Sequence, residues 1–174
     1  MINFTKFDFN EIFGVVKMTE GMQRPQLRTY RAEIQEYAIE KYSGGQLKYV
    51  GDTEDGKDFY GVDDDNLVYE SKGINGMFQT DKTDWCKEIV LKNFYSKNTG
   101  IPDQTFDYML LWDTTTYRAA ICSWDTCMKY AKVTDANVKC KINKDDITFV
   151  ADNVTPVEKG DYAEKLKKLM IASI

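Results

Sequence analysis

Apolar and polar positions follow a helical period in one early segment of the chain. From Leu27 to Tyr42 the apolar residues recur every three or four positions, and the sequence Ser43-Gly44-Gly45 follows them. This spacing predicts an amphipathic helix that ends at the glycines. Residues 1–20 show no comparable punctuation, and we expect their apolar side chains to pack on the core: Phe4, Phe7, Phe9, Ile12 and Phe13.

The following segments have the composition of short strands. "QLKYVGD" (46–52), "KDFYGV" (57–62) and "LVYESK" (67–72) are separated by acidic turns, which predicts a β-meander. Two further strands are predicted at 106–113 and 117–124, joined by the turn "DTTT"; the first is almost continuously apolar and should be central in the sheet.

Three other segments complete the predicted elements. Residues 80–100 are expected to be helical at their centre, with Gly100 as the stop, and 162–171 should form a last amphipathic helix. The segments 138–142 and 147–151 are interpreted as a late hairpin around "NKDD" or as an edge element.

The order of these elements predicts an α+β domain with a central mixed sheet flanked by helices. We interpret residues 1–174 as a single domain, with a core at about 27–125 and a C-terminal region, 126–174, that serves specificity or dimerisation.

Composition restricts the chemistry. The chain has no histidine, which excludes Ser-His-Asp and Cys-His catalysis and histidine-ligated zinc. With 23 basic and 28 acidic residues the net charge is −5, which argues against a general nucleic-acid coat. The four cysteines lack C-x-x-C spacing and are expected to be buried free thiols. No apolar run approaches the ~20 residues of a membrane span, and Asp8 and Glu11 do not suit a signal peptide. We therefore expect a cytoplasmic protein without a membrane partner.

The chemistry-bearing residues lie in "KDFYGVDDDNLVYESKGIN" (57–75). Side chains alternate along a strand, so Glu70 and Lys72 share one face, and Asp58 opens the preceding strand. This arrangement resembles the catalytic pattern of the PD-(D/E)XK nuclease superfamily, and most closely its type II restriction endonucleases. Lys57 stands where the full signature has proline.

The resemblance implies a catalytic set of Asp58, Glu70 and Lys72, and a Mg²⁺ ion, with Mn²⁺ as a substitute, held by Asp58, Glu70 and the Ser71 carbonyl. Lys72 would orient the attacking water or stabilise the developing charge. It also implies a helix glutamate, either Glu33 or Glu36, and we favour Glu33 because it flanks the apolar stripe. The aspartates 63–65 are most simply interpreted as turn residues, but one of them could replace Asp58 as a metal ligand.

The implied substrate is double-stranded DNA, cut by a homodimer, although a homing endonuclease, a resolvase, a repair nickase and an RNA substrate stay open. Candidate nucleic-acid contacts are the polar and basic residues Arg24, Arg28, Arg31, Asn75, Gln79, Thr80, Lys82 and Lys87. The competing interpretation is a non-catalytic acidic binding protein of phage or plasmid origin.

Overall fold

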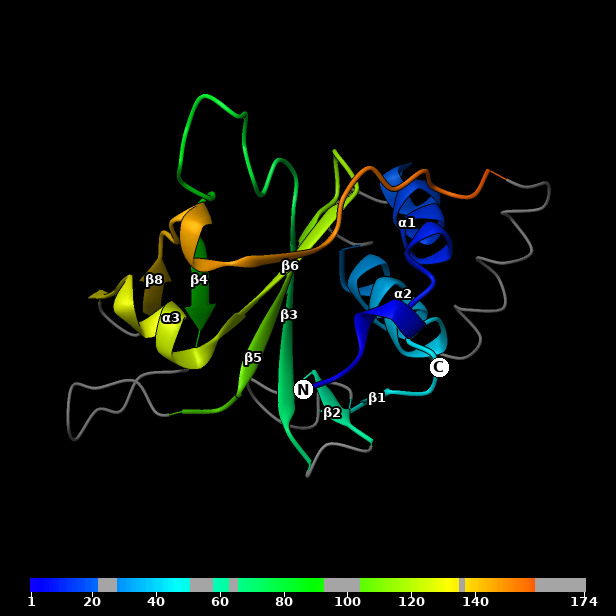
Figure 1. The fold of residues 1–174 in the computed structure, drawn as a ribbon, viewed down its shortest axis with the longest axis horizontal. Coiled ribbons are helices and arrows are strands. Elements are labelled where there is room, and N and C mark those ends of the chain that lie inside the picture. The colour runs from blue at the N-terminus through cyan, green and yellow to red at the C-terminus, as the bar shows by residue number, and fades with distance from the viewer. Residues whose placement is uncertain (22–27, 51–57, 63–65, 93–103, 135–136, 159–174) are drawn as a thin grey trace.

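The largest element of the protein is a mixed β-sheet of six strands in the order β1-β2-β3-β5-β6-β9 (Figure 1). The computed structural model describes residues 1–21, 28–50, 58–62, 66–92, 104–134 and 137–158. Strands β3 and β5 pair in parallel and the other neighbours pair antiparallel. The strands are β1 (Leu47–Tyr49), β2 (Phe59–Gly61), β3 (Val68–Ile74), β5 (Tyr108–Asp113), β6 (Arg118–Ser123) and β9 (Thr148–Ala151).

Two helices cover one face of this sheet. They are α1 (Phe9–Met18) and α2 (Arg28–Lys41), and α1 begins at Asp8, whose carboxylate accepts the Glu11 backbone N–H at 3.2 Å. Phe13 of α1 packs with Tyr69 and Trp112 of the sheet in one apolar cluster. Burying each such side chain contributes about 1.5–3 kcal/mol, so this layer fixes where α2 lies against β3.

A second, smaller sheet covers the opposite face together with α3 (Trp124–Lys129). Its order is β4-β8-β7, all antiparallel, and the strands are β4 (Ile89–Lys92), β7 (Ala131–Thr134) and β8 (Asn137–Cys140). Its inner residues Ile89, Leu91 and Val138 pack in one cluster with Met109 and Leu111 of β5. The large sheet is therefore sandwiched between a helical layer and the small sheet (Figure 1).

The α+β class and the mixed sheet predicted from the sequence are confirmed. The first predicted helix is α2, the predicted meander is β1-β2-β3, and β5 is central in its sheet. The N-terminal aromatic residues pack on the core as expected, but they do so partly from α1, which the sequence pattern did not predict. All four cysteines are free and buried, also as expected.

The helix expected within 80–100 is wrong over its described part, 80–92. This part is irregular and ends in β4, because its backbone bonds to distant segments: the Cys86 N–H donates to the Ile142 carbonyl and Lys87 to Met77. The buried residues Ile89 and Leu91 alternate with a period of two, as a strand requires.

The late hairpin around "NKDD" is also wrong, and the edge alternative is confirmed for its second half. β8 pairs with β4 and β7, whereas β9 pairs with β6 at the edge of the large sheet. The 3₁₀ turn Lys144–Asp146 carries the chain from one sheet to the other. The predicted helix at 162–171 lies outside the described residues. None of the described helices has the length and apolar character needed to cross a bilayer.

Candidate active site

Strands β2 and β3 bring two carboxylates to one place on the sheet. Phe59 pairs with Tyr69, so Asp58, one residue earlier, comes opposite Glu70, one residue later. Directly opposed residues of an antiparallel pair share a face. The Asp58 carboxylate also accepts the Ser71 backbone N–H at 2.8 Å, which turns it toward β3. The predicted pairing of Asp58 with Glu70 is present in the structure.

Glu70 is a buried carboxyl group with an unsatisfied oxygen. Its side chain is 7% exposed, and its Oε2 atom has no hydrogen-bond partner among the described residues. Burial, the neighbouring Asp58 carboxylate and the more remote Glu36 together raise its pKa to about 9, while Lys72 acts in the opposite direction. The protonated Glu70 therefore donates a hydrogen bond to Asp58 at neutral pH. A buried acidic pair of this kind is destabilising unless a cation or a proton compensates its charge.

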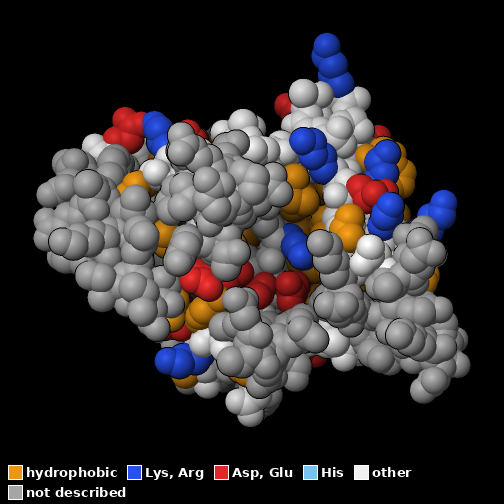
Figure 2. Space-filling view, turned by 180° about the vertical axis from the view of Figure 1, so that it is seen from behind, with side chains coloured by type: hydrophobic (Ala, Val, Ile, Leu, Met, Phe, Trp, Pro, Cys, Tyr) orange, Lys and Arg blue, Asp and Glu red, His pale blue; other side chains and the backbone are white. Residues whose placement is uncertain are grey.

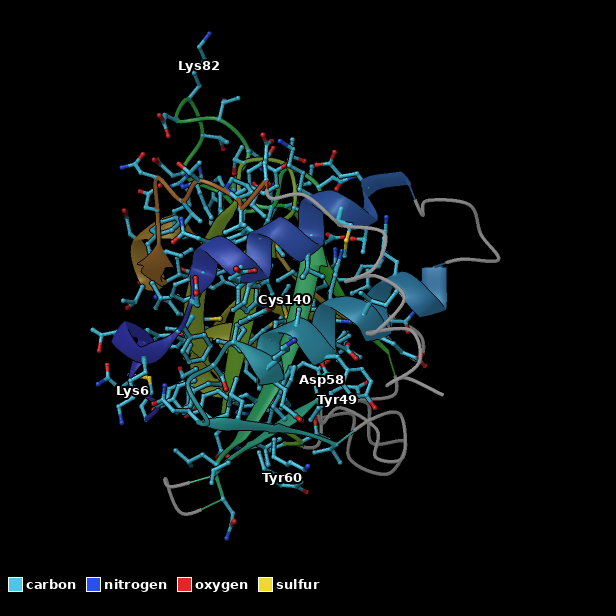
Figure 3. The ribbon with its side chains drawn as sticks, turned by 90° about the vertical axis from the view of Figure 1, so that its right-hand side faces the viewer. Lys6, Tyr49, Asp58, Tyr60, Lys82 and Cys140 are labelled. Carbon is cyan, nitrogen blue, oxygen red and sulfur yellow. The ribbon has the colours of Figure 1, made fainter. Side chains whose placement is uncertain are left out.

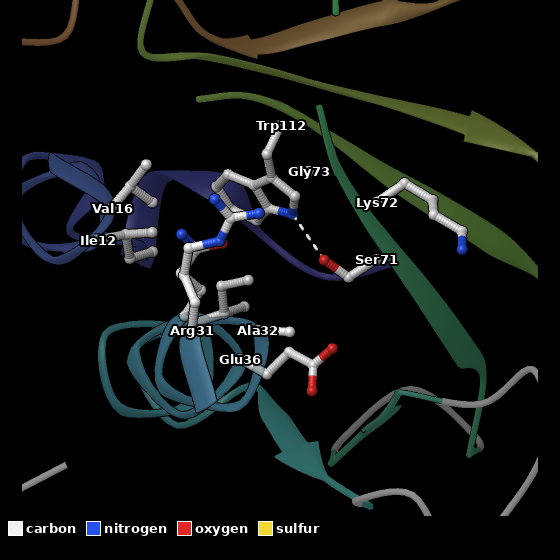
Figure 4. A pocket seen from close by; sticks show the side chains of 11 residues that line it. Ile12, Val16, Arg31, Ala32, Glu36, Ser71, Lys72, Gly73 and Trp112 are labelled. Atoms are coloured by element: carbon white, nitrogen blue, oxygen red, sulfur yellow. Dashed lines mark hydrogen bonds between the residues drawn. The ribbon is translucent and has the colours of Figure 1, made fainter. Parts of the chain in front are cut away.

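The two apolar clusters, one on each side of the large sheet, show which way each side chain of β3 points. Tyr69 belongs to the cluster under the helices, and Val68 and Ile74 pack against the cluster under the small sheet. Glu70 and Lys72 therefore face the small-sheet side, whereas the Ser71 hydroxyl accepts the Trp112 indole N–H at 2.9 Å on the helix side. Figure 4 shows the Lys72 side chain leaving β3 on the side opposite to Ser71.

Among the glutamates of α2, Glu36 is the one that affects the pKa of Glu70. It is half-buried, lines the same cavity as Lys72, and contributes to the raised pKa of Glu70. Figure 4 shows its carboxylate pointing from α2 toward β3. Glu33, favoured from the sequence, lies one turn earlier on α2 and is neither in this cavity nor among the groups that shift the pKa of Glu70. The row of glutamates on this helix could be recognised in the sequence. The angle at which α2 packs decides which of them reaches the site, and this angle could not be predicted.

A cavity of about 230 Å³ adjoins these residues between α1, α2, β3 and β5. Its walls combine apolar residues of α1 with Trp112 and with the polar side chains Arg31, Gln35 and Ser71. Arg31, a predicted nucleic-acid contact, extends into it in Figure 4. A second cavity of about 200 Å³ shares Arg31, Gln35 and Gly73 with the first and reaches Asn75. Arg31 is therefore a predicted contact that lines the same cavity as Lys72.

The other predicted contacts beyond Lys72 spread along the loop that follows β3. Asn75 is exposed, accepts from the Thr114 hydroxyl through its side chain, and accepts Lys87 Nζ through its carbonyl at 2.8 Å. The Gln79 amide donates to the Trp85 carbonyl at 2.8 Å, and the Thr80 carbonyl accepts Lys144 Nζ at 3.0 Å. These bonds fold the loop on itself.

Other predicted residues lie farther away or outside the described part. Lys82 is at the opposite end of the molecule from Asp58 (Figure 3). The side chain of Arg28 is not among those described, and Arg24 and the aspartates 63–65 lie outside the described residues.

The donor set fits a hard divalent cation. Within the described part of the chain, no three carboxylate or thiol side chains converge tightly enough to hold a metal ion by themselves. Mg²⁺ does not need three, since it is usually bound through one or two carboxylates and keeps several waters. Asp58 and Glu70 supply two carboxylates, and the unpartnered Glu70 Oε2 supplies a buried oxygen without another ligand. This orphaned atom is the observation that favours a cation here.

Acidic side chains gather at the centre of one face of the molecule. Figure 2 shows Asp and Glu side chains gathered at the centre of one face, with Lys and Arg side chains on its right-hand side. Because this view is turned by 180° from Figure 1, that side is where β4 and β8 lie.

Comparison with known proteins adds no family to this geometry. No model of a known protein family matches the chain, and no curated protein matches it. The function has to be argued from the arrangement of Asp58, Glu70, Lys72 and Glu36.

Proposed function

We propose that this protein is a Mg²⁺-dependent DNA endonuclease that hydrolyses phosphodiester bonds at the Asp58–Glu70 pair. The observation that carries the proposal is the buried, unpartnered Oε2 of Glu70 opposite Asp58, with Lys72 on the same face of β3. A buried carboxyl group beside a second, half-buried carboxylate destabilises the fold, and such groups cluster at functional sites. The resemblance to PD-(D/E)XK nucleases supports the same assignment.

Asp58, Glu70 and the Ser71 carbonyl would hold the cation, which supplies Lewis-acid stabilisation of the phosphate and a more acidic bound water. Lys72 contributes a positive charge on the same face, where it stabilises the negative charge that develops on the phosphate. Glu36 extends from α2 toward this site and provides a further acceptor for an ordered water. Arg31, in the adjoining cavity, provides a cation for a neighbouring phosphate.

Within this class, a type II restriction enzyme is the assignment closest to the resemblance. Such an enzyme cuts both strands of a symmetric site, and a two-fold symmetric dimer places one active site on each strand. Double-stranded DNA and a homodimeric state are therefore parts of the proposal.

Cleavage by purified protein tests the proposal. We expect discrete fragments from plasmid and phage DNA with Mg²⁺ or Mn²⁺, and a loss of activity of roughly a hundredfold or more in Asp58→Asn, Glu70→Gln and Lys72→Ala. Lys48→Ala, an exposed lysine of β1, is the matched control and should cleave normally. Intact DNA from the wild-type chain with both metals would overturn the proposal and favour the non-catalytic binding protein.

Metal binding provides an independent readout. Mn²⁺ should raise the thermal midpoint of the wild-type chain, because a ligand that binds only the native state stabilises it. The same addition should leave Asp58→Asn and Glu70→Gln unchanged. An equal shift in all three proteins would place the cation elsewhere.

A further inference from the structure

The outward face of the small sheet carries opposed lysines. In β7 and β8, Lys132 pairs directly with Lys139, and the residues on either side of this pair, Ala131 with Cys140 and Val133 with Val138, form the inner register. Val138 and Cys140 are buried in the core, so Lys132 and Lys139 point away from it. Lys141 follows in the same alternation, between the buried Cys140 and Ile142.

These lysines have little compensation from acidic groups. Among the residues that the structure describes, no carboxylate forms an ion pair with any of the three. Ile89 pairs with Cys140, so Glu88 comes opposite Lys141, whereas Lys132 and Lys139 face each other without such an acidic partner in the register. Like charges placed directly opposite each other in an antiparallel pair are destabilising. Lys132 and Lys139 therefore concentrate positive charge on one sheet face of a chain whose net charge is −5.

The basic face and the candidate active site belong to the same side of the large sheet. Glu70 and Lys72 point to the side on which the small sheet packs. Figure 2 shows Asp and Glu side chains at the centre of one face and Lys and Arg side chains toward the side on which the small sheet lies.

We propose that Lys132, Lys139 and Lys141 form a phosphate-contacting surface for duplex DNA, on the side of the large sheet toward which Glu70 and Lys72 point. The inference rests on the proposed nuclease function and deepens it by assigning the surface that holds the duplex. Phosphates spaced along a duplex match a row of lysines, and neutralising them releases counterions and so supplies affinity. Lysines in this role position the duplex and carry no sequence information.

The experiment measures equilibrium binding of a short DNA duplex across a range of salt concentrations, with Ca²⁺ in place of Mg²⁺ so that binding does not depend on cleavage. The test variant is Lys132→Gln/Lys139→Gln/Lys141→Gln. The matched control, Lys6→Gln/Lys41→Gln/Lys48→Gln, removes the same charge from three exposed lysines elsewhere.

We expect the test variant to bind roughly tenfold more weakly or worse at about 0.1 M salt, with a salt dependence reduced by roughly 2 to 3 in the slope of log K against log salt. The control should stay within about twofold of the wild-type chain. A wild-type chain that does not bind duplex DNA, an equal loss in both variants, or a preference for RNA over DNA would each overturn the assignment.

The two proposals fail separately. The surface would be supported and the nuclease overturned if the test variant lost DNA binding selectively while the wild-type chain cleaved no DNA with Mg²⁺ or Mn²⁺. The nuclease would be supported and the surface overturned if cleavage required Asp58 while replacement of the three lysines changed neither the DNA affinity nor the cleavage rate.

Discussion

At the scale of single residues, Glu70 carries the most information. Strand parity in "LVYESKG" predicts that Glu70 and Lys72 share one face, and the register of β2 places Asp58 opposite Glu70. The burial of Glu70 and its unpartnered Oε2 could not be predicted, because both depend on how β5, α2 and the small sheet close around β3. For the same reason, the sequence did not separate Glu36 from Glu33.

The raised pKa of Glu70 predicts a dependence of stability on pH without metal. The folded state keeps a proton on Glu70 up to a pKa of about 9, whereas the unfolded chain releases it near the ordinary glutamate pKa of 4.5. Above pH ~4.5 the unfolded state is therefore favoured progressively, and folding stability falls until about pH 9. Each pH unit in this window costs up to about 1.4 kcal/mol from this group.

Glu70→Gln retains a neutral side chain that can donate to Asp58, so it should remove this loss. Without metal, we expect the free energy of unfolding of the variant to exceed that of the wild-type chain by up to about 5 kcal/mol near pH 8. The difference should shrink toward pH ~5. Urea unfolding with EDTA across this range measures it, with the exposed Glu88→Gln as control. A constant difference at every pH would show that Glu70 is ionised in the folded state.

At the scale of elements, local pattern and long-range pairing compete. The strands with clear apolar runs, β3, β5 and β6, and the amphipathic helix α2 were predicted from their own residues. Residues 80–92 have a helix-like composition, but their backbone groups bond to residues far along the chain, and Ile89 and Leu91 pair with β8. Such pairings do not leave a local signal, which is why the late hairpin was also wrong.

Because Lys132 of β7 and Lys139 of β8 face each other, we expect the fold to become more stable when the charge of one of them is reversed by substitution. Lys132→Glu converts a like-charge cross-strand pair into an opposite-charge pair with Lys139, and we expect the free energy of unfolding to rise by about 0.2–1 kcal/mol. DNA binding should weaken in the same variant. Lys48→Glu on β1, opposite Tyr60, has no such lysine partner in the register and should change stability little. A destabilised Lys132→Glu chain in urea unfolding would contradict the argument.

At the scale of the whole molecule, the helical layer and the small sheet cover opposite faces of the large sheet. The helical layer packs on one face of the sheet and brings Glu36 into the cavity that Lys72 also lines, while strand alternation turns Glu70 and Lys72 toward the face on which the small sheet packs with its lysines outward. An acidic chain can thus combine the proposed cation site with a pair of opposed lysines on the same side of the large sheet. Net charge alone, read from the sequence, argued against a general nucleic-acid coat.

The number of active sites in the working assembly predicts the order of products from supercoiled plasmid. A 20.1 kDa chain holds one Asp58–Glu70 pair, so cutting both strands in one binding event needs two chains. We expect linear plasmid to form with little nicked circle at saturating protein, and a mixture of wild-type and excess Asp58→Asn chains to accumulate nicked circle, since mixed dimers carry one competent site. Agarose electrophoresis over time measures both. Full accumulation of nicked circle by the wild-type chain alone would instead identify a nickase that acts as a monomer.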